Sequence, residues 1–124
     1  MVATGALLMA LGVVLGAFGA HGLEGKITPE KIEVWKTGVL YHLLHALGIV
    51  ALGVFATQLR APSAALTAAF VCLVVGILFF SGSIYGLALG GPRWLGPITP
   101  LGGLLFIVGW LLFAWVAFSA PRAG

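Results

Sequence analysis

The sequence predicts an all-α membrane protein: a four-transmembrane-helix up-down bundle that forms a single domain over residues 1–124. Its composition excludes an ordinary soluble domain, because 61% of the residues are hydrophobic and only 7% are charged, against about 25% charged in soluble proteins. Four apolar segments of about twenty residues or more divide the chain, and each could cross about 30 Å of hydrocarbon as a helix. The 19 glycines agree, since glycine is commoner in membrane helices than in soluble ones.

The first, third and fourth helices follow from uninterrupted apolar runs. We expect the first at residues 2–20, which contain no charged side chain, and the third at residues 64–89. The fourth is expected at residues 99–119. Its start is marked by Thr99 followed by Pro100, a pair typical of an N-cap and a first helical residue.

The second helix is expected to span the membrane at residues 33–57. Thr28 followed by Pro29 again predicts an N-cap and a first helical residue, so helical structure should begin near Pro29, outside the bilayer. Trp35 would then lie at the level of the lipid headgroups, where an indole ring is favoured.

The connections predict how the helices are arranged. Short connections make neighbouring helices antiparallel, so the first and third connections lie on one side and both termini lie on the other. In the first connection, Glu33 and Lys36 are spaced to form an ion pair. The positive-inside rule places the first and third connections in the cytoplasm and the termini outside. The cations that decide this are Lys26, Lys31, Lys36 and Arg93 on one side, against Arg60 and Arg122 on the other.

Polar side chains gather at the helix ends on the side of the first and third connections. His42 and His45 share one face of the second helix, because residues three apart are neighbours on a helix surface. An ionisable residue at membrane depth should face the bundle interior and find a partner there. We therefore expect a shared polar niche near one leaflet. Its candidate ligand-binding residues are His21, Tyr41, His42, His45, Ser81, Ser83 and Tyr85.

The role of the histidines stays open at the level of sequence. They could tie the helices together, because a neutral imidazole has one donor and one acceptor to satisfy. They could instead form a metal site from His21, His42 and His45, since imidazole suits zinc, copper or iron. They could also serve a haem site, a pocket for a quinone, lipid headgroup or small solute, or a proton relay or channel. The sequence requires no cofactor.

Several classes of function are not expected. The chain has no basic cluster to bind nucleic acid, and its formal charge of +3 comes from six cations and three acids. It lacks a nucleophile–base–acid arrangement, a phosphate-binding loop and a zinc-protease motif, so we predict that it is not an enzyme. The predicted partner is the lipid bilayer. Glycine stripes on the first and third helices could pack helices within the chain, or support a homo-oligomer or larger membrane complex: Gly12 and Gly16, and Gly82, Gly86 and Gly90.

Four motifs together resemble a known family. They are GAFGAHGL at residues 16–23, W-x-x-G-x-x-Y-H-x-x-H-A-L at 35–47, FFSGSIYGLAL at 79–89 and WLGPITPLGGLLFIVGWLLFA at 94–114. In order and spacing they resemble the domain of unknown function 423 family of small bacterial membrane proteins (YgdD- and YwdK-like), which is similar to eukaryotic transmembrane protein 256. The resemblance implies a multi-pass protein of the cytoplasmic (inner) membrane, and it implies no established activity.

The most consistent functional prediction is a small integral membrane protein that acts as a non-enzymatic scaffold or accessory subunit of a membrane assembly. The alternative is a binder or conductor of a small ligand (quinone, lipid, metal ion or proton) through a His/Tyr/Ser-lined pocket near one leaflet. The two differ in the interior. A scaffold should fill the polar niche with its own hydrogen bonds, whereas a binder should leave a cavity there.

Overall fold

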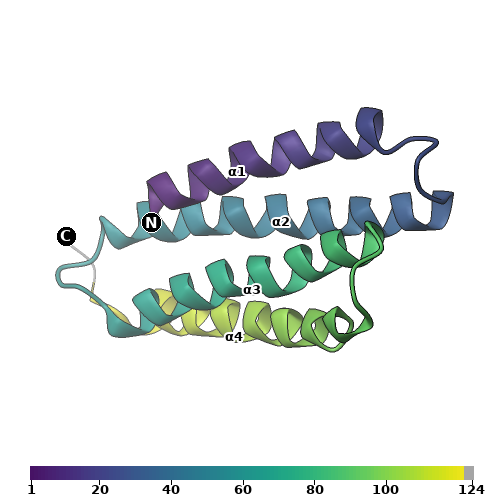
Figure 1. Cartoon of the computed structure of the whole chain (residues 1–124). Coiled ribbons are helices and arrows are strands. Elements are labelled where there is room, and N and C mark those ends of the chain that lie inside the picture. Colours follow the sequence, from purple (N-terminus) through teal and green to yellow (C-terminus); the bar gives the residue numbers. More distant parts are fainter. Residues whose placement is uncertain (122–124) are drawn as a thin grey trace.

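A computed structural model describes residues 1–121 and contains four long helices (Figure 1). Each, together with its flanking turn, is long and apolar enough to cross a membrane. The elements are α1 (Val2–Ala17) with a π-helical turn η1 (Phe18–Gly22), α2 (Pro29–Ala56), α3 (Ala64–Ala88), a 3-10 turn η2 (Arg93–Leu95) and α4 (Ile98–Ser119). The predicted fold class is therefore confirmed, and the four helices coincide with the four predicted spans to within a few residues at their ends.

Consecutive helices are antiparallel neighbours, as the short connections predict. The main helix pairs are α1 with α2, α2 with α3, and α3 with α4. The N-terminus, the end of α4 and the second connection lie at one end of the bundle, and the first and third connections lie at the other (Figure 1). Within the described residues, α1 and α4 have no extensive contact with each other, so α1 forms an open edge of the bundle.

The largest hydrophobic core lies among α2, α3 and α4. It includes Ile49 and Leu52 of α2, Leu73 of α3 and Phe106 of α4. Many large apolar side chains face outward instead, including Phe118, which is 93% exposed. Apolar residues both inside and outside are what a lipid environment requires, because the solvent itself is hydrocarbon.

Glycines on α1 let this helix approach α2 closely. Gly5 and Gly12 of α1 and Gly19 of the following turn η1 recur every seventh residue, and all three are buried. A Cβ atom at Gly12 would lie 2.6 Å from Leu43 Cδ2, and one at Gly5 would lie 2.8 Å from the backbone nitrogen of Val50. The glycines of α1 thus serve packing within the chain.

The glycines of α3 do not form one packing stripe. A Cβ atom at Gly82 would meet nothing within 4 Å, whereas one at Gly86 would lie 2.6 Å from Leu95 Cδ1. Gly90 has a φ of 86° and lies in the turn after α3, where a residue with a side chain would be strained. These equally spaced glycines therefore have different surroundings: Gly82 faces open space, Gly86 lies against Leu95, and Gly90 forms the turn after α3.

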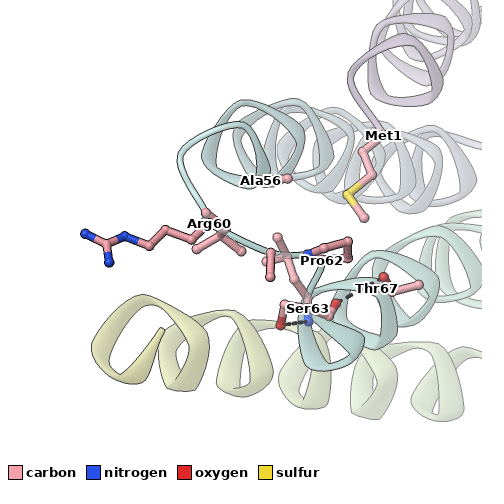
Figure 2. A pocket seen from close by; sticks show the side chains of 9 residues that line it. Met1, Ala56, Arg60, Pro62, Ser63 and Thr67 are labelled. Atoms are coloured by element: carbon pink, nitrogen blue, oxygen red, sulfur yellow. Dashed lines mark hydrogen bonds between the residues drawn. The ribbon is translucent and has the colours of Figure 1, made fainter. Parts of the chain in front are cut away.

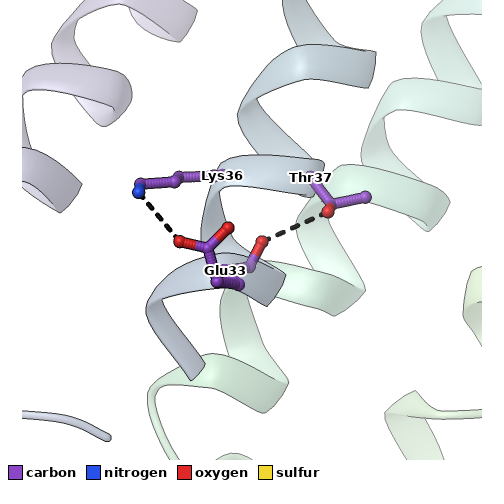
Figure 3. A network of polar contacts seen from close by, with 3 residues as sticks. All are labelled: Glu33, Lys36 and Thr37. Carbon is purple, nitrogen blue, oxygen red and sulfur yellow. Dashed lines mark hydrogen bonds and ion pairs between the residues drawn. The ribbon is translucent and has the colours of Figure 1, made fainter. Parts of the chain in front are cut away.

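The start of α2 confirms the predicted cap. Thr28 Oγ1 accepts a hydrogen bond from the Lys31 amide at 3.3 Å, and Pro29 is the first helical residue. One turn later, Lys36 Nζ lies 2.9 Å from Glu33 Oε1, as predicted, and the Thr37 hydroxyl donates to the Glu33 carbonyl (Figure 3). This ion pair is exposed, so it adds little stability.

The start of α4 differs from the prediction. The helix begins at Ile98, preceded by Pro97, and Thr99 already lies inside its first turn. Thr99 is therefore not the N-cap, and its hydroxyl is hydrogen-bonded to Ser83 of α3. A tertiary contact has replaced the local one that the sequence suggested.

Candidate functional site

His42 joins three helices near the middle of α2. Its ring is buried; Nε2 lies 2.8 Å from the carbonyl oxygen of Leu8 in α1, and Nδ1 lies 3.0 Å from the hydroxyl of Tyr85 in α3. A carbonyl can only accept, so Nε2 carries the ring proton and donates it to Leu8. Nδ1 of the neutral ring then accepts from the Tyr85 hydroxyl. Both nitrogens are thus used to hold helices together.

Glycines expose the carbonyls that α1 offers to α2. Four residues after Leu8 comes Gly12, and a Cβ atom there would lie 3.3 Å from His42 Cδ2. Four residues after Leu15 comes Gly19, where a Cβ atom would lie 2.5 Å from Nε1 of Trp35. Because neither glycine has a side chain, a ring from α2 can reach the carbonyl one turn earlier on α1.

Trp35 uses the second of these openings, so its indole ring faces the bundle interior. It is only 2% exposed, and its indole N–H donates to the Leu15 carbonyl at 2.9 Å. Its ring also packs against Tyr85, with 4.6 Å between the ring centroids. The indole of Trp35 therefore anchors α1 on α2 instead of facing lipid headgroups.

The two predicted serines of α3 bond to both neighbouring helices. Ser81 donates to the Gly38 carbonyl of α2 at 2.7 Å. Ser83 donates to the Phe80 carbonyl at 2.9 Å, and its oxygen lies 2.5 Å from the Thr99 hydroxyl of α4. A serine hydroxyl has a single proton, so Thr99 is the donor in the second bond. The two serine hydroxyl groups thus extend the interhelical hydrogen bonds from α2 through α3 to α4.

His21 does not join this cluster, which corrects the sequence-based expectation. It is exposed in η1 and forms no hydrogen bond with the part of the chain that the structure describes. Residues 1–121 contain no group of three His, Cys, Asp or Glu side chains that could hold a metal ion. The predicted metal site of His21, His42 and His45 is therefore not assembled, because η1 turns His21 outward and both nitrogens of His42 are occupied.

His45 has a different environment from His42. Its Nδ1 lies 2.7 Å from the Tyr41 carbonyl of its own helix, and its ring stacks on Phe106 with 3.5 Å between centroids. It borders a groove of about 600 Å³ between α2 and α4. The other residues lining this groove include Tyr41, Phe80, Gly103, Leu104, Phe106 and Trp110. The sequence pattern predicted Tyr41 and His45 but not the α4 side of the groove, because apolar residues in an apolar helix give no distinguishing signal.

A second cavity of about 380 Å³ lies at the opposite end of the bundle, by the connection between α2 and α3 (Figure 2). Its hydroxyl groups already serve the helix start. Ser63 Oγ accepts from the Leu66 amide at 3.2 Å, and the Thr67 hydroxyl donates to the Ser63 carbonyl at 3.1 Å. Met1 points toward this cavity, whereas the Arg60 side chain extends away from it (Figure 2). We assign these polar groups to capping of α3.

Four apolar helices of membrane-spanning length, joined inside by their own polar side chains, define a small multi-pass integral membrane protein. The sequence matches the family described as Protein of unknown function (DUF423) over residues 15–103. The chain belongs to this family.

Relatives with high sequence identity cover almost the whole chain. The UPF0382 membrane protein YwdK of Bacillus subtilis is 46% identical over 113 residues, which are 91% of each chain. The UPF0382 membrane protein SH2409 of Staphylococcus haemolyticus is 48% identical over 108 residues, covering 87% of this chain and 86% of the relative. No solved structure matches the chain significantly.

Proposed function

We propose that this protein is a non-enzymatic scaffold or accessory subunit of a membrane assembly. The supporting observation is that three buried polar side chains of the bundle interior have their hydrogen-bond partners within the bundle. His42, Ser81 and Ser83 each reach a neighbouring helix, so their hydrogen-bonding capacity serves the fold. Such ties make a rigid body that can hold other membrane proteins in place.

The outer faces of α1 and α4 are the surfaces available to a protein partner. α1 is the least buried of the four helices. Leu7 of α1 is 73% exposed and Leu111 of α4 is 66% exposed. In a membrane, helices associate through close packing of such surfaces, with no hydrophobic force to help.

Photocrosslinking tests the scaffold proposal. A photoreactive residue at Leu7 or Leu111, in cells expressing the chain at its natural level, should yield a discrete protein adduct from at least one position. The same probe at Ala69, which is fully buried, is the matched control and should yield none. Purification in mild detergent should recover the same partner, or a second copy of this chain. Adducts with lipid alone at both exposed positions, and a monomer after purification, would contradict the proposal.

We further propose that the chain resides in the cytoplasmic (inner) membrane with both termini outside. The supporting observation is the excess of cations in the first and third connections. Arg122, one of the two opposing cations, lies outside the described residues.

Reporter fusions test this orientation. Alkaline phosphatase fused after the C-terminus should be active, because it matures only outside the cytoplasm. Green fluorescent protein inserted after Gly25, an exposed residue of the first connection, should fluoresce. An inactive C-terminal phosphatase together with a fluorescent C-terminal fusion would show the reverse orientation.

The alternative role, binding of a small ligand, is supported at one place only. His42 leaves no free nitrogen, but His45 borders the open groove between α2 and α4.

A further inference from the structure

The hydrogen-bonding character of His45 is fixed by its own helix. Nδ1 lies 2.7 Å from the Tyr41 carbonyl, which can only accept, so Nδ1 carries the proton and Nε2 is an acceptor in the neutral ring. Nε2 forms no hydrogen bond with any residue in the described part of the chain. The side chain is 7% exposed, and no fully buried side-chain nitrogen or oxygen in residues 1–121 lacks a partner. Nε2 is therefore an accessible, unpaired acceptor.

The depth of this acceptor restricts what can reach it. His45 lies near the middle of α2, a helix of 28 residues and thus about 42 Å long. The groove extends along α4 from Pro100, near the helix start, to Trp110, near its centre. A charged phospholipid headgroup stays at the membrane surface, because moving a charge into hydrocarbon is costly. A ligand that meets Nε2 must therefore be neutral and soluble in hydrocarbon.

The walls of the groove favour a flat ring. Tyr41, Phe80 and Phe106 surround His45, and the Tyr41 and Phe80 centroids lie 4.5 Å apart. Aromatic side chains pack well against planar rings in offset or edge-on arrangements. Gly103 keeps the groove open, because a Cβ atom there would be 3.8 Å from the Phe80 ring and would begin to fill it. The volume of about 600 Å³ lies within the range of small-molecule sites.

We propose that this groove binds a neutral aromatic alcohol with an apolar tail, a molecule of the hydroquinone type, whose hydroxyl group donates a hydrogen bond to Nε2 of His45. The corresponding quinone offers only carbonyl acceptors, which cannot bond to an acceptor nitrogen. Changing the tautomer of His45 would break its bond to the Tyr41 carbonyl. At Nε2 of His45, the reduced molecule therefore gains a hydrogen bond that the oxidised one cannot form. This binding role is separate from the proposed scaffold role and does not depend on it.

The test compares decyl-benzoquinol with decyl-benzoquinone, which share ring and tail. Equilibrium binding to the purified chain in phosphatidylcholine nanodiscs, without oxygen, should be about tenfold tighter for the quinol, the size expected of one hydrogen bond. Equal affinities for the two molecules, or no binding of either, would overturn the proposal. No protein partner is present in this assay, so its result is independent of the crosslinking experiment.

Three variants locate the site. His45→Phe keeps a ring against Phe106 but lacks the acceptor, so it should bind quinol about tenfold more weakly, at the level of the quinone. Gly103→Leu keeps His45 and fills the groove, so it should bind neither molecule. Gly82→Leu is the matched control, because a Cβ atom there meets nothing within 4 Å, and it should bind as the wild type does.

The second variant, Gly103→Leu, keeps the test decisive if His45→Phe fails to fold. Size-exclusion profiles and thermal unfolding identify a misfolded His45→Phe, in which case Gly103→Leu decides the question. Loss of quinol binding in folded Gly103→Leu supports the groove. Unchanged quinol binding in either folded variant, or an equal loss in Gly82→Leu, overturns it.

Discussion

Replacing Gly102 by alanine is expected to force α3 and α4 apart and to lower the free energy of unfolding by about 2–3 kcal/mol. A Cβ atom at Gly102 would lie 2.8 Å from both Cα and Cβ of Phe80 and would overlap its backbone nitrogen. Backbone atoms cannot rotate out of the way as a side chain can, so one helix must move. That movement would loosen Phe106, a member of the main core one turn further along α4. Thermal or denaturant unfolding in detergent micelles, followed by circular dichroism, measures the loss.

Gly103→Ala is the matched control for this prediction. The substitution is the same and lies one residue further along α4, but its Cβ atom would be 3.8 Å from the Phe80 ring, an ordinary contact. Alanine is a better helix former than glycine by up to about 1 kcal/mol, so this variant should be as stable as the wild type or slightly more stable. Similar losses in both variants would show that the close approach at Gly102 does not limit stability.

The helices could be predicted from sequence because their determinants are local. Hydropathy and length define the four spans, and Thr28 with Pro29 marks the start of α2 without help from distant residues. Where a distant partner competes for the same group, local inference fails. Thr99 resembles an N-cap residue in the sequence, yet it lies inside the first turn of α4 and its hydroxyl is hydrogen-bonded to Ser83. Trp35 resembles an interfacial anchor in the sequence, yet its indole N–H donates a hydrogen bond to the Leu15 carbonyl.

The site was predictable only in part, and for a related reason. Antiparallel topology places the start of α2 beside the end of α3, so the connections alone put Tyr85 among the possible partners of His42. The second partner of His42 is a backbone carbonyl, that of Leu8, and every residue has one. The sequence did contain an indication of this contact. Gly12 and Gly19 are seven residues apart, and the absence of their side chains exposes carbonyls of α1 to rings on α2. Periodicity of hydrophobic residues does not reveal it, because the whole helix is apolar.

The groove beside His45 depends on features that sequence does not encode locally. Two helices that are not consecutive, α2 and α4, must diverge enough to leave space, and that separation is set by the way both pack on α3. Gly102 brings α4 onto Phe80, while Gly103 next to it leaves the groove open. Two neighbouring glycines therefore have opposite roles. They differ only in the direction in which a Cβ atom would project from the α4 helix.

Replacing His42 by phenylalanine is expected to lower the free energy of unfolding by about 2–4 kcal/mol. Phenylalanine keeps the bulk of the ring but removes both hydrogen bonds, at 2.8 Å to the Leu8 carbonyl and 3.0 Å to the Tyr85 hydroxyl. An interhelical hydrogen bond in a membrane contributes about 0.6–1.7 kcal/mol. The Tyr85 hydroxyl keeps Ser81 as a hydrogen-bond partner, so its loss of His42 adds at most about 1 kcal/mol more. The same unfolding measurement in micelles tests this loss.

A double-mutant cycle measures the bond between His42 and Tyr85 by itself. With His42→Phe already present, Tyr85→Phe has no bond to His42 left to break, so the second change should cost about 1 kcal/mol less than it does in the wild type. His21→Phe is the control, since this exposed ring has no partner within residues 1–121 and should change stability by less than about 0.5 kcal/mol. Strictly additive losses for His42 and Tyr85 would mean that the two rings do not share a bond. The interior of the bundle would then be held by packing of Gly12, Gly19 and their neighbours, without the polar chain from Tyr85 through His42 to Leu8.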